Sequence, residues 1–224
     1  MYEGTRVSTG EPRLDLQGRT THRRRVQRFF GDHVPTEIFI NPLSAIRVYL
    51  AAEHEAGRPS TAHMLATGHV VFQRGAELDR LRKEAREWLG RQSVPDEAAA
   101  IRARYAIATA VDDAAEVAAD DPATSAMLIT HTAIERLEFW CRAKTGHIPR
   151  RKDLLVRVTA VDPALGALGR RVFLARSCAE REAAAAELAD RTIGVRGFFE
   201  WDSGAEAVRH EPAHHIGGRT GLCR

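Results

Sequence analysis

Apolar positions near the start of the chain alternate with a period of two. Residues 24–30 and 36–40 carry β-branched and aromatic side chains, and Gly31 and Pro35 lie in the segment between them. This pattern predicts two neighbouring strands joined as a hairpin. A further apolar run at 69–74 predicts a short third strand.

Apolar positions follow helical spacing from about residue 43 onwards. Helices are predicted at 43–56, 58–68, 76–90, 96–119, from 121, at 150–159, from 162, and at 177–191. Asp121-Pro122 and Asp162-Pro163 each place an N-cap residue before a proline at the first helical position. Ser177 and Glu180 have the spacing of a capping box, which marks the start of the last helix.

The helix that starts at residue 121 has one predicted apolar face. Its inward positions are expected to be Met127, His131, Ile134, Leu137 and Cys141. His131 would then be a core histidine that has found a hydrogen-bond partner, rather than a catalytic base.

Strands come first and helices follow, which predicts an α+β fold dominated by helices. The expected units are a small α/β core at 24–90 and a C-terminal helical bundle at 91–203. Residues 1–23 have no usable period and are expected to be disordered or a truncated domain edge. Residues 204–224 are expected to be a disordered tail.

Composition narrows the class of protein. Of 224 residues, 44% are apolar and 28% are charged, which is typical of a globular protein, and a net charge of +3 does not indicate nucleic-acid binding. No run of 18 apolar residues predicts a membrane span, and no secretory signal opens the chain. Three widely spaced cysteines fit a reducing compartment, so we expect a cytoplasmic protein.

Several segments together resemble a known family. VPTEIFINPLSAIRVYL, GRPSTAHMLATGHVVFQRGAELDRLRKEAREWL, RARYAIATAVDDAAEV, HIPRRKDLLVRVTAVDPAL and GFFEWDSG look like bacterial nucleotidyltransferase-domain proteins of the kanamycin nucleotidyltransferase and minimal nucleotidyltransferase type. The resemblance covers roughly residues 24–203. It implies that 24–90 is a partial nucleotidyltransferase core with an incomplete mixed sheet.

The resemblance also implies a chemistry. Such proteins transfer a nucleoside monophosphate from ATP or another nucleoside triphosphate to a hydroxyl of a small molecule or a protein. Two Mg²⁺ ions, held by three carboxylates from adjacent strands, would bridge the phosphates and activate the attacking oxygen. Two of these carboxylates form an Asp-x-Asp that follows a Gly-Ser turn.

Glu37 matches the third of these carboxylates. A metal ligand would explain a charge inside the apolar run TEIFI. The alternative is a solvent-facing residue, because a period of two places Thr36, Ile38 and Ile40 on one face and Glu37 with Phe39 on the other.

The rest of the metal-binding motif does not match. The chain contains no Gly-Ser and no Asp-x-Asp, and the nearest counterpart is Asp15, with Arg13 in place of the first carboxylate. A guanidinium there would repel Mg²⁺. We therefore expect an N-terminally truncated protein that is inactive as written, with Glu37 and Asp15 as the candidate catalytic and metal-binding residues.

Lys152, in the sequence PRRKDLL, matches a lysine that contacts nucleotide phosphates in the related enzymes, and the alternative is a solvated basic helix start. Arg142 and His147 have the R-x₄-H spacing of helical ribonuclease toxins. Gly146 and Pro149 break the helix around that histidine, which disfavours the ribonuclease hypothesis.

Two functions remain open from the sequence. The first is a nucleotidyltransferase-family protein whose ligands are a nucleotide and an unidentified hydroxyl acceptor. The second is a non-catalytic binding or partner protein that uses the helical bundle to form a homodimer.

Overall fold

The computed structural model describes residues 22–31 and 33–205 of the chain. Within these residues it is a helix-dominated α+β fold, in which an antiparallel hairpin of β1 (Arg24–Phe30) and β2 (Val34–Ile40) precedes eight α-helices. The helices are α1 (Leu43–Glu55), α2 (Ser60–Thr67), α3 (Glu77–Gly90), α4 (Glu97–Val117), α5 (Pro122–Thr145), α6 (Leu154–Val161), α7 (Pro163–Leu174) and α8 (Cys178–Thr192), with a short 3-10 helix, η1 (Arg151–Asp153), before α6.

The hairpin has the predicted alternation of its two faces. Thr36, Ile38 and Ile40 are half-buried, whereas Glu37 and Phe39 are exposed. The strands pair in register from Arg24 opposite Ile40 to Phe30 opposite Val34. The expectation of a hairpin at this place is therefore confirmed.

The third strand expected at 69–74 is wrong, and among the described residues the sheet consists of two antiparallel strands only. The segment lies between α2 and α3, where Val71 and Phe72 are 92% and 71% exposed. High β-propensity does not make a strand without a partner edge to hydrogen-bond. Instead, the Gln73 amide donates to the Gly75 carbonyl (2.9 Å) and to Asp79 Oδ2 (2.6 Å), which shapes a loop.

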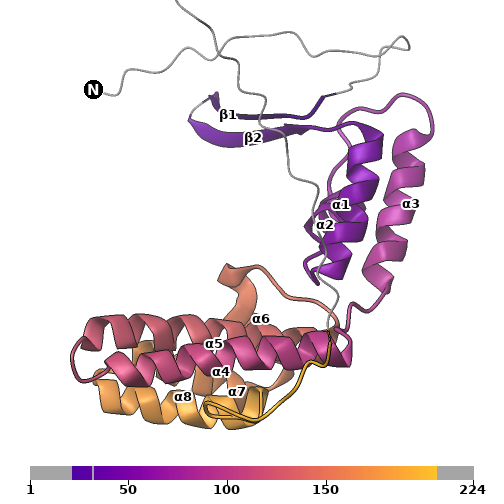
Figure 1. Ribbon diagram of the computed structural model, residues 1–224. Helices are drawn as coiled ribbons and strands as arrows, with labels where there is room; N and C mark the ends of the chain where they lie inside the picture. Colours follow the sequence, from indigo (N-terminus) through magenta and orange to yellow (C-terminus); the bar gives the residue numbers. More distant parts are fainter. Residues whose placement is uncertain (1–21, 32, 206–224) are drawn as a thin grey trace, which may run out of the picture.

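Helices α1, α2 and α3 pack on one another and stand at one end of the bundle (Figure 1). Their small core contains Leu50, Ala62 and Ala85, which are fully buried, with Trp88 packed against them. Asn41 and Pro42 connect the end of β2 to the start of α1, so the hairpin is attached to the bundle through the α1–α3 unit.

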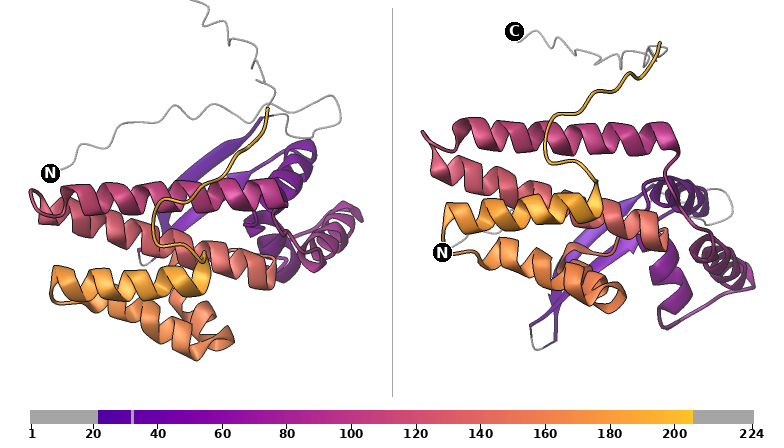
Figure 2. Two further views of the ribbon diagram at one scale, coloured as in Figure 1. Left: turned by 60° about the horizontal axis from the view of Figure 1, so that its bottom comes forward. Right: turned by 90° about the horizontal axis from the view of Figure 1, so that it is seen from below.

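Helices α4, α5 and α8 run side by side, and α6 and α7 complete the bundle (Figure 2). The bundle holds the main apolar core, which includes Leu137, Val158, Leu165, Leu168 and Val172. Leu165, Leu168 and Val172 form the buried face of α7. After α8 the chain returns along α4, where the ring of Trp201 lies 5.3 Å from that of Tyr105.

The predicted inward face of α5 is only partly correct. Leu137 and Cys141 are buried, but Met127 is 61% exposed and the His131 side chain is 53% exposed. The buried face runs instead through residues such as Ile129 and Ala133. Met127 lies two residues before Ile129, and His131 lies two residues before Ala133. Two residues correspond to a rotation of about 200° around the helix, so Met127 and His131 lie on the opposite side. His131 is thus a surface residue that faces Glu135 at 3.5 Å.

The predicted helix starts are confirmed by their caps. The Asp121 carboxylate accepts from the backbone N–H groups of Ala123 and Thr124, and that of Asp162 accepts from the N–H of Leu165. At the capping box, the N–H of Glu180 donates to the Ser177 hydroxyl at 3.2 Å. Each such cap contributes about 1 kcal/mol to helix stability.

None of the helices within residues 22–205 combines the length and the apolar character that crossing a lipid bilayer requires.

Gly166 permits the close approach of α6 and α7, and its substitution tests that packing. A Cβ atom at this position would lie 2.7 Å from the Thr159 Cα, so Gly166→Ala forces the two helices apart. We expect the free energy of unfolding to fall by about 2 kcal/mol, measured by urea denaturation. Gly90→Ala is the control, because a Cβ there meets no atom within 4 Å. A loss of equal size in Gly90→Ala would contradict the packing explanation.

Candidate functional site

A groove of about 840 Å³ lies between the base of the hairpin and helices α1 and α2. Three consecutive arginines approach it from the hairpin side, and the helices supply aromatic, hydroxyl and apolar side chains. The lining residues are Arg23, Arg24, Arg25, Phe39, Asn41, Ile46, Tyr49, Glu53, Ser60, Thr61, Met64 and Leu65. The groove therefore combines positive charge with aromatic surface.

Two of the arginines lie against aromatic rings. The Arg23 guanidinium donates to the Tyr49 hydroxyl and lies 5.6 Å from the centre of that ring. The Arg25 guanidinium lies 4.7 Å from the centre of the Phe39 ring. Such stacking holds an arginine in place while leaving most of its N–H donors available to an anion.

The helical wall of the groove is fixed by one carboxylate. Glu53 accepts hydrogen bonds from the backbone N–H of Thr61 (2.6 Å) and from its hydroxyl (2.8 Å). The contact joins α1 to the start of α2. Glu53 is the only carboxylate among the lining residues that the structure describes, against three arginines. The net character of the groove is consequently basic.

Glu37 lies on the same face of the hairpin as the groove residues Arg25 and Phe39. Its side chain is 41% exposed, and Oε1 is 3.7 Å from the Arg25 Nε and 3.4 Å from the Gln27 amide nitrogen. The solvent-facing alternative from the sequence thus describes its position. An exposed pair of this kind contributes little to stability.

The described residues do not fit a two-metal centre. No group of three or more histidine, cysteine, aspartate or glutamate side chains within residues 22–31 and 33–205 could hold a metal ion. Around Glu37 the neighbouring charge is the cation of Arg25, which opposes a second cation. Asp15, the other predicted ligand, lies outside the described residues.

Lys152 is exposed on η1 and is not among the described residues that line the groove. Its neighbours Arg150 and Arg151 pair with Asp153 (2.6 Å) and Glu138 (3.5 Å). The structure therefore places Lys152 at the junction of η1 with the bundle rather than beside Glu37. Its role as a phosphate contact stays a prediction.

Glu138 and Arg58 form the most buried ion pair of this junction. The carboxylate is only 12% exposed, and its Oε2 accepts from the Arg58 guanidinium at 2.6 Å. The backbone adds a second link, because the N–H of Ile148 donates to the Gly57 carbonyl at 2.7 Å. These contacts hold the loop before α2 against the bundle.

Arg142 and His147 also serve this junction. The Arg142 guanidinium donates to the backbone carbonyls of Ser93 and Glu55, and His147 Nε2 lies 3.3 Å from the Leu89 carbonyl. Burial, followed by the nearby charge of His147, lowers the pKa of His54 in the same region. Because Arg142 and His147 contact backbone groups, the arrangement does not support ribonuclease chemistry.

Sequence reasoning missed the groove residues Arg23, Arg25 and Tyr49. The run HRRRVQR is visible in the sequence, but only its strand pattern enters the prediction of the hairpin. The usable signal was its position next to a predicted strand that also carries Phe39. A basic run that alternates with aromatic residues is typical of a surface that binds phosphates and bases.

No protein-family model, no curated protein and no solved structure matches this chain. The likeness to nucleotidyltransferases therefore stays a prediction from the sequence segments.

The Arg58–Glu138 pair can be tested by removing the cation. Arg58→Met leaves the buried Glu138 carboxylate with Arg151, at 3.5 Å, as its remaining cation in the described part of the chain. We therefore expect the free energy of unfolding to fall by about 2 kcal/mol. Chemical denaturation measures the change.

The matched control is Arg171→Met, which breaks the exposed pair of Arg171 with Glu187. Both members of that pair are more than half exposed, so its loss should cost less than about 1 kcal/mol. Equal effects of the two substitutions would show that the junction does not depend on the buried pair.

Proposed function

We propose that the chain is a nucleotidyltransferase-family protein that binds a nucleoside triphosphate, with ATP as the reference ligand, in the hairpin groove. The observation that carries the proposal is the convergence of Arg23, Arg24 and Arg25 with the rings of Phe39 and Tyr49 on one groove. Arginine recognises phosphate through paired N–H donors, and an aromatic face accepts a stacked base.

The dimensions of the groove agree with such a ligand. About 840 Å³ falls in the range of small-molecule sites, which is roughly 300–1,000 Å³. Asn41, Ser60 and Thr61 add neutral polar groups to the lining, which suits a ribose or a base edge. The apolar residues Ile46 and Leu65 complete the surface on the helical side.

Nucleotide transfer is a separate question from nucleotide binding. The family chemistry needs three carboxylates around Mg²⁺, and the described residues bring only Glu37 to this face of the hairpin. We therefore derive no transfer step, and the proposal is that these residues bind the nucleotide. The hydroxyl acceptor, a small molecule or a protein, belongs to the transfer reaction and stays open.

A second candidate is a partner-binding role with the bundle as the dimer surface. The favouring observation is exposed apolar surface on α6 and α7, where Val156 and Leu174 are 64% and 75% exposed. Light scattering after size exclusion tests it directly. A mass near twice 24.8 kDa that falls to 24.8 kDa in Leu174→Ser would favour this candidate.

Nucleotide binding should depend on the groove arginines and not on charge in general. In isothermal titration calorimetry, we expect saturable ATP binding that weakens about tenfold in Arg25→Met, the loss of one charge-assisted contact. Arg28→Met is the control, because Arg28 lies on the same strand and is not among the described lining residues. It removes an equal charge and should change the Kd for ATP less than about twofold.

Two results would contradict the proposal. The first is an equal loss in both variants, which would indicate non-specific attraction of ATP to a basic hairpin. The second is the absence of saturable ATP binding to the wild-type chain.

Glu37 can be assigned by the effect of Mg²⁺. The Glu37 carboxylate lies beside Arg25, so its negative charge should repel a phosphate bound there. When EDTA is present, Glu37→Gln should therefore bind ATP at least as tightly as the wild type does. If Glu37 holds a metal, the same variant should bind ATP about tenfold more weakly at millimolar Mg²⁺. Equal affinity of the two chains at all Mg²⁺ concentrations would rule out the metal role.

A further inference from the structure

A second cavity lies inside the bundle, away from the hairpin groove. It has a volume of about 220 Å³ and lies among helices α4, α5 and α8. Its walls are mainly apolar, with polar side chains at the floor and at the rim. The lining residues are Val111, Ala114, Ala115, Ser125, Ile129, Thr132, Arg136, Glu182, Ala185, Ala186 and Arg196.

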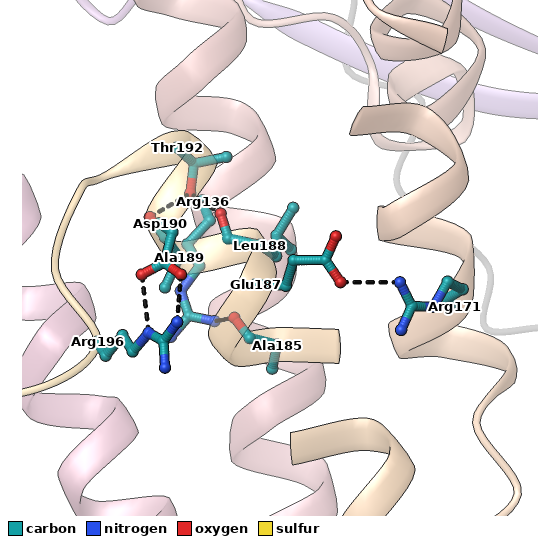
Figure 3. Close-up of polar contacts among 9 residues, drawn as sticks. All are labelled: Arg136, Arg171, Ala185, Glu187, Leu188, Ala189, Asp190, Thr192 and Arg196. Atoms are coloured by element: carbon teal, nitrogen blue, oxygen red, sulfur yellow. Dashed lines mark hydrogen bonds and ion pairs between the residues drawn. The ribbon is translucent and has the colours of Figure 1, made fainter. Parts of the chain in front are cut away.

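Arg136 is the unusual member of this lining. It is 1% exposed, and one terminal N–H of its guanidinium donates to the Ala185 carbonyl at 2.9 Å (Figure 3). Within residues 22–31 and 33–205, its Nε has no hydrogen-bond partner. Among the described residues, no carboxylate forms an ion pair with this arginine.

A buried arginine without a counter-charge is costly for a protein. Burial lowers the pKa of Arg136 to about 10, so the group still carries its charge at neutral pH. The nearby carboxylate of Glu135 raises that pKa, but it faces His131 at 3.5 Å. Buried charges in folded proteins are normally paired or bound to a ligand.

The rim does not supply the missing anion. Arg196 is held by Asp190, whose Oδ1 accepts from the Arg196 Nε at 2.8 Å (Figure 3). Glu182 is exposed on α8 and forms no ion pair among the described residues. An anion that enters the cavity would therefore meet the Arg136 guanidinium, and the Ser125 and Thr132 hydroxyl groups belong to the same lining.

We propose that the bundle cavity binds a small carboxylate with an apolar body, and that Arg136 recognises the carboxylate group. A purely inorganic ion fits this cavity less well, because it would leave Val111, Ile129 and the alanines of α4 and α8 without an apolar contact. A cavity of 150 Å³ holds benzene. The larger volume here suits an acid of about the size of benzoate.

Benzoate is the probe for this site, and benzyl alcohol is its neutral counterpart of nearly equal size. In ligand-observed NMR titrations of the full chain, we expect saturable one-to-one binding of benzoate and at least about tenfold weaker binding of benzyl alcohol. Benzoate should also raise the Tm, by an amount that grows with the logarithm of its concentration above Kd.

Two variants test the recognition separately. Arg136→Met removes the donor and should weaken benzoate binding at least about tenfold, while the chain stays folded, because an apolar residue of similar length suits a buried site. Ala186→Leu keeps Arg136 and narrows the cavity, and should weaken binding to a similar degree. Ala183→Leu, on the same helix but outside the described lining, should leave binding within about twofold.

Three outcomes would overturn the proposal. The first is equal binding of benzoate and benzyl alcohol. The second is binding of benzoate to Arg136→Met that is as tight as binding to the wild type. The third is a rise in Tm with chloride alone, while benzoate shows no saturable binding. If Arg136→Met does not fold, Ala186→Leu compared with Ala183→Leu decides the question. Because ATP binds elsewhere in our account, failure here leaves the groove proposal unchanged.

Discussion

The guanidinium of Arg142 is the contact on which the arrangement of the two helical units depends. It reaches from the end of α5 to the backbone carbonyl of Glu55 at the end of α1 and to that of Ser93 in the loop before α4. Gly57 makes room for it, because a Cβ there would lie 3.0 Å from the Arg142 Nε. One charged side chain thus binds two backbone carbonyls from different segments, which also fixes how the two units meet.

The candidate groove depends on this junction indirectly. Arg58 follows the Gly57 turn and binds Glu138 of the bundle, and two residues later α2 begins with Ser60 and Thr61, which line the groove. The bundle therefore positions the helical wall, while the hairpin supplies the arginines. The hairpin contributes Phe39 as well, and the helices contribute Tyr49 and the hydroxyl groups, so the complete groove forms where strand and helix meet.

Local signals in the sequence were sufficient for the hairpin, the helices and their caps, since each depends on neighbouring residues such as Asp162 with Pro163. The strand expected at 69–74 failed because strand formation needs a partner edge that local sequence does not specify. The face of α5 was misassigned because His131 and Met127 share a helical period with true core residues. Arg136 gave a signal that was overlooked, namely a cation at a core position of the segment IERLEFW. The basic run beside Phe39 gave a partial signal for the groove, but its helical wall could not be predicted, because those residues meet the hairpin only in the folded chain.

The central claim is that the hairpin groove holds a nucleotide, and photoaffinity labelling with azido-ATP tests it most directly. Irradiation of the full chain, followed by peptide mass spectrometry, should place the label on the peptides that contain Phe39 and Tyr49, and excess ATP should remove it. Labelling confined to helices α4–α8, or labelling that excess ATP does not reduce, would contradict the account.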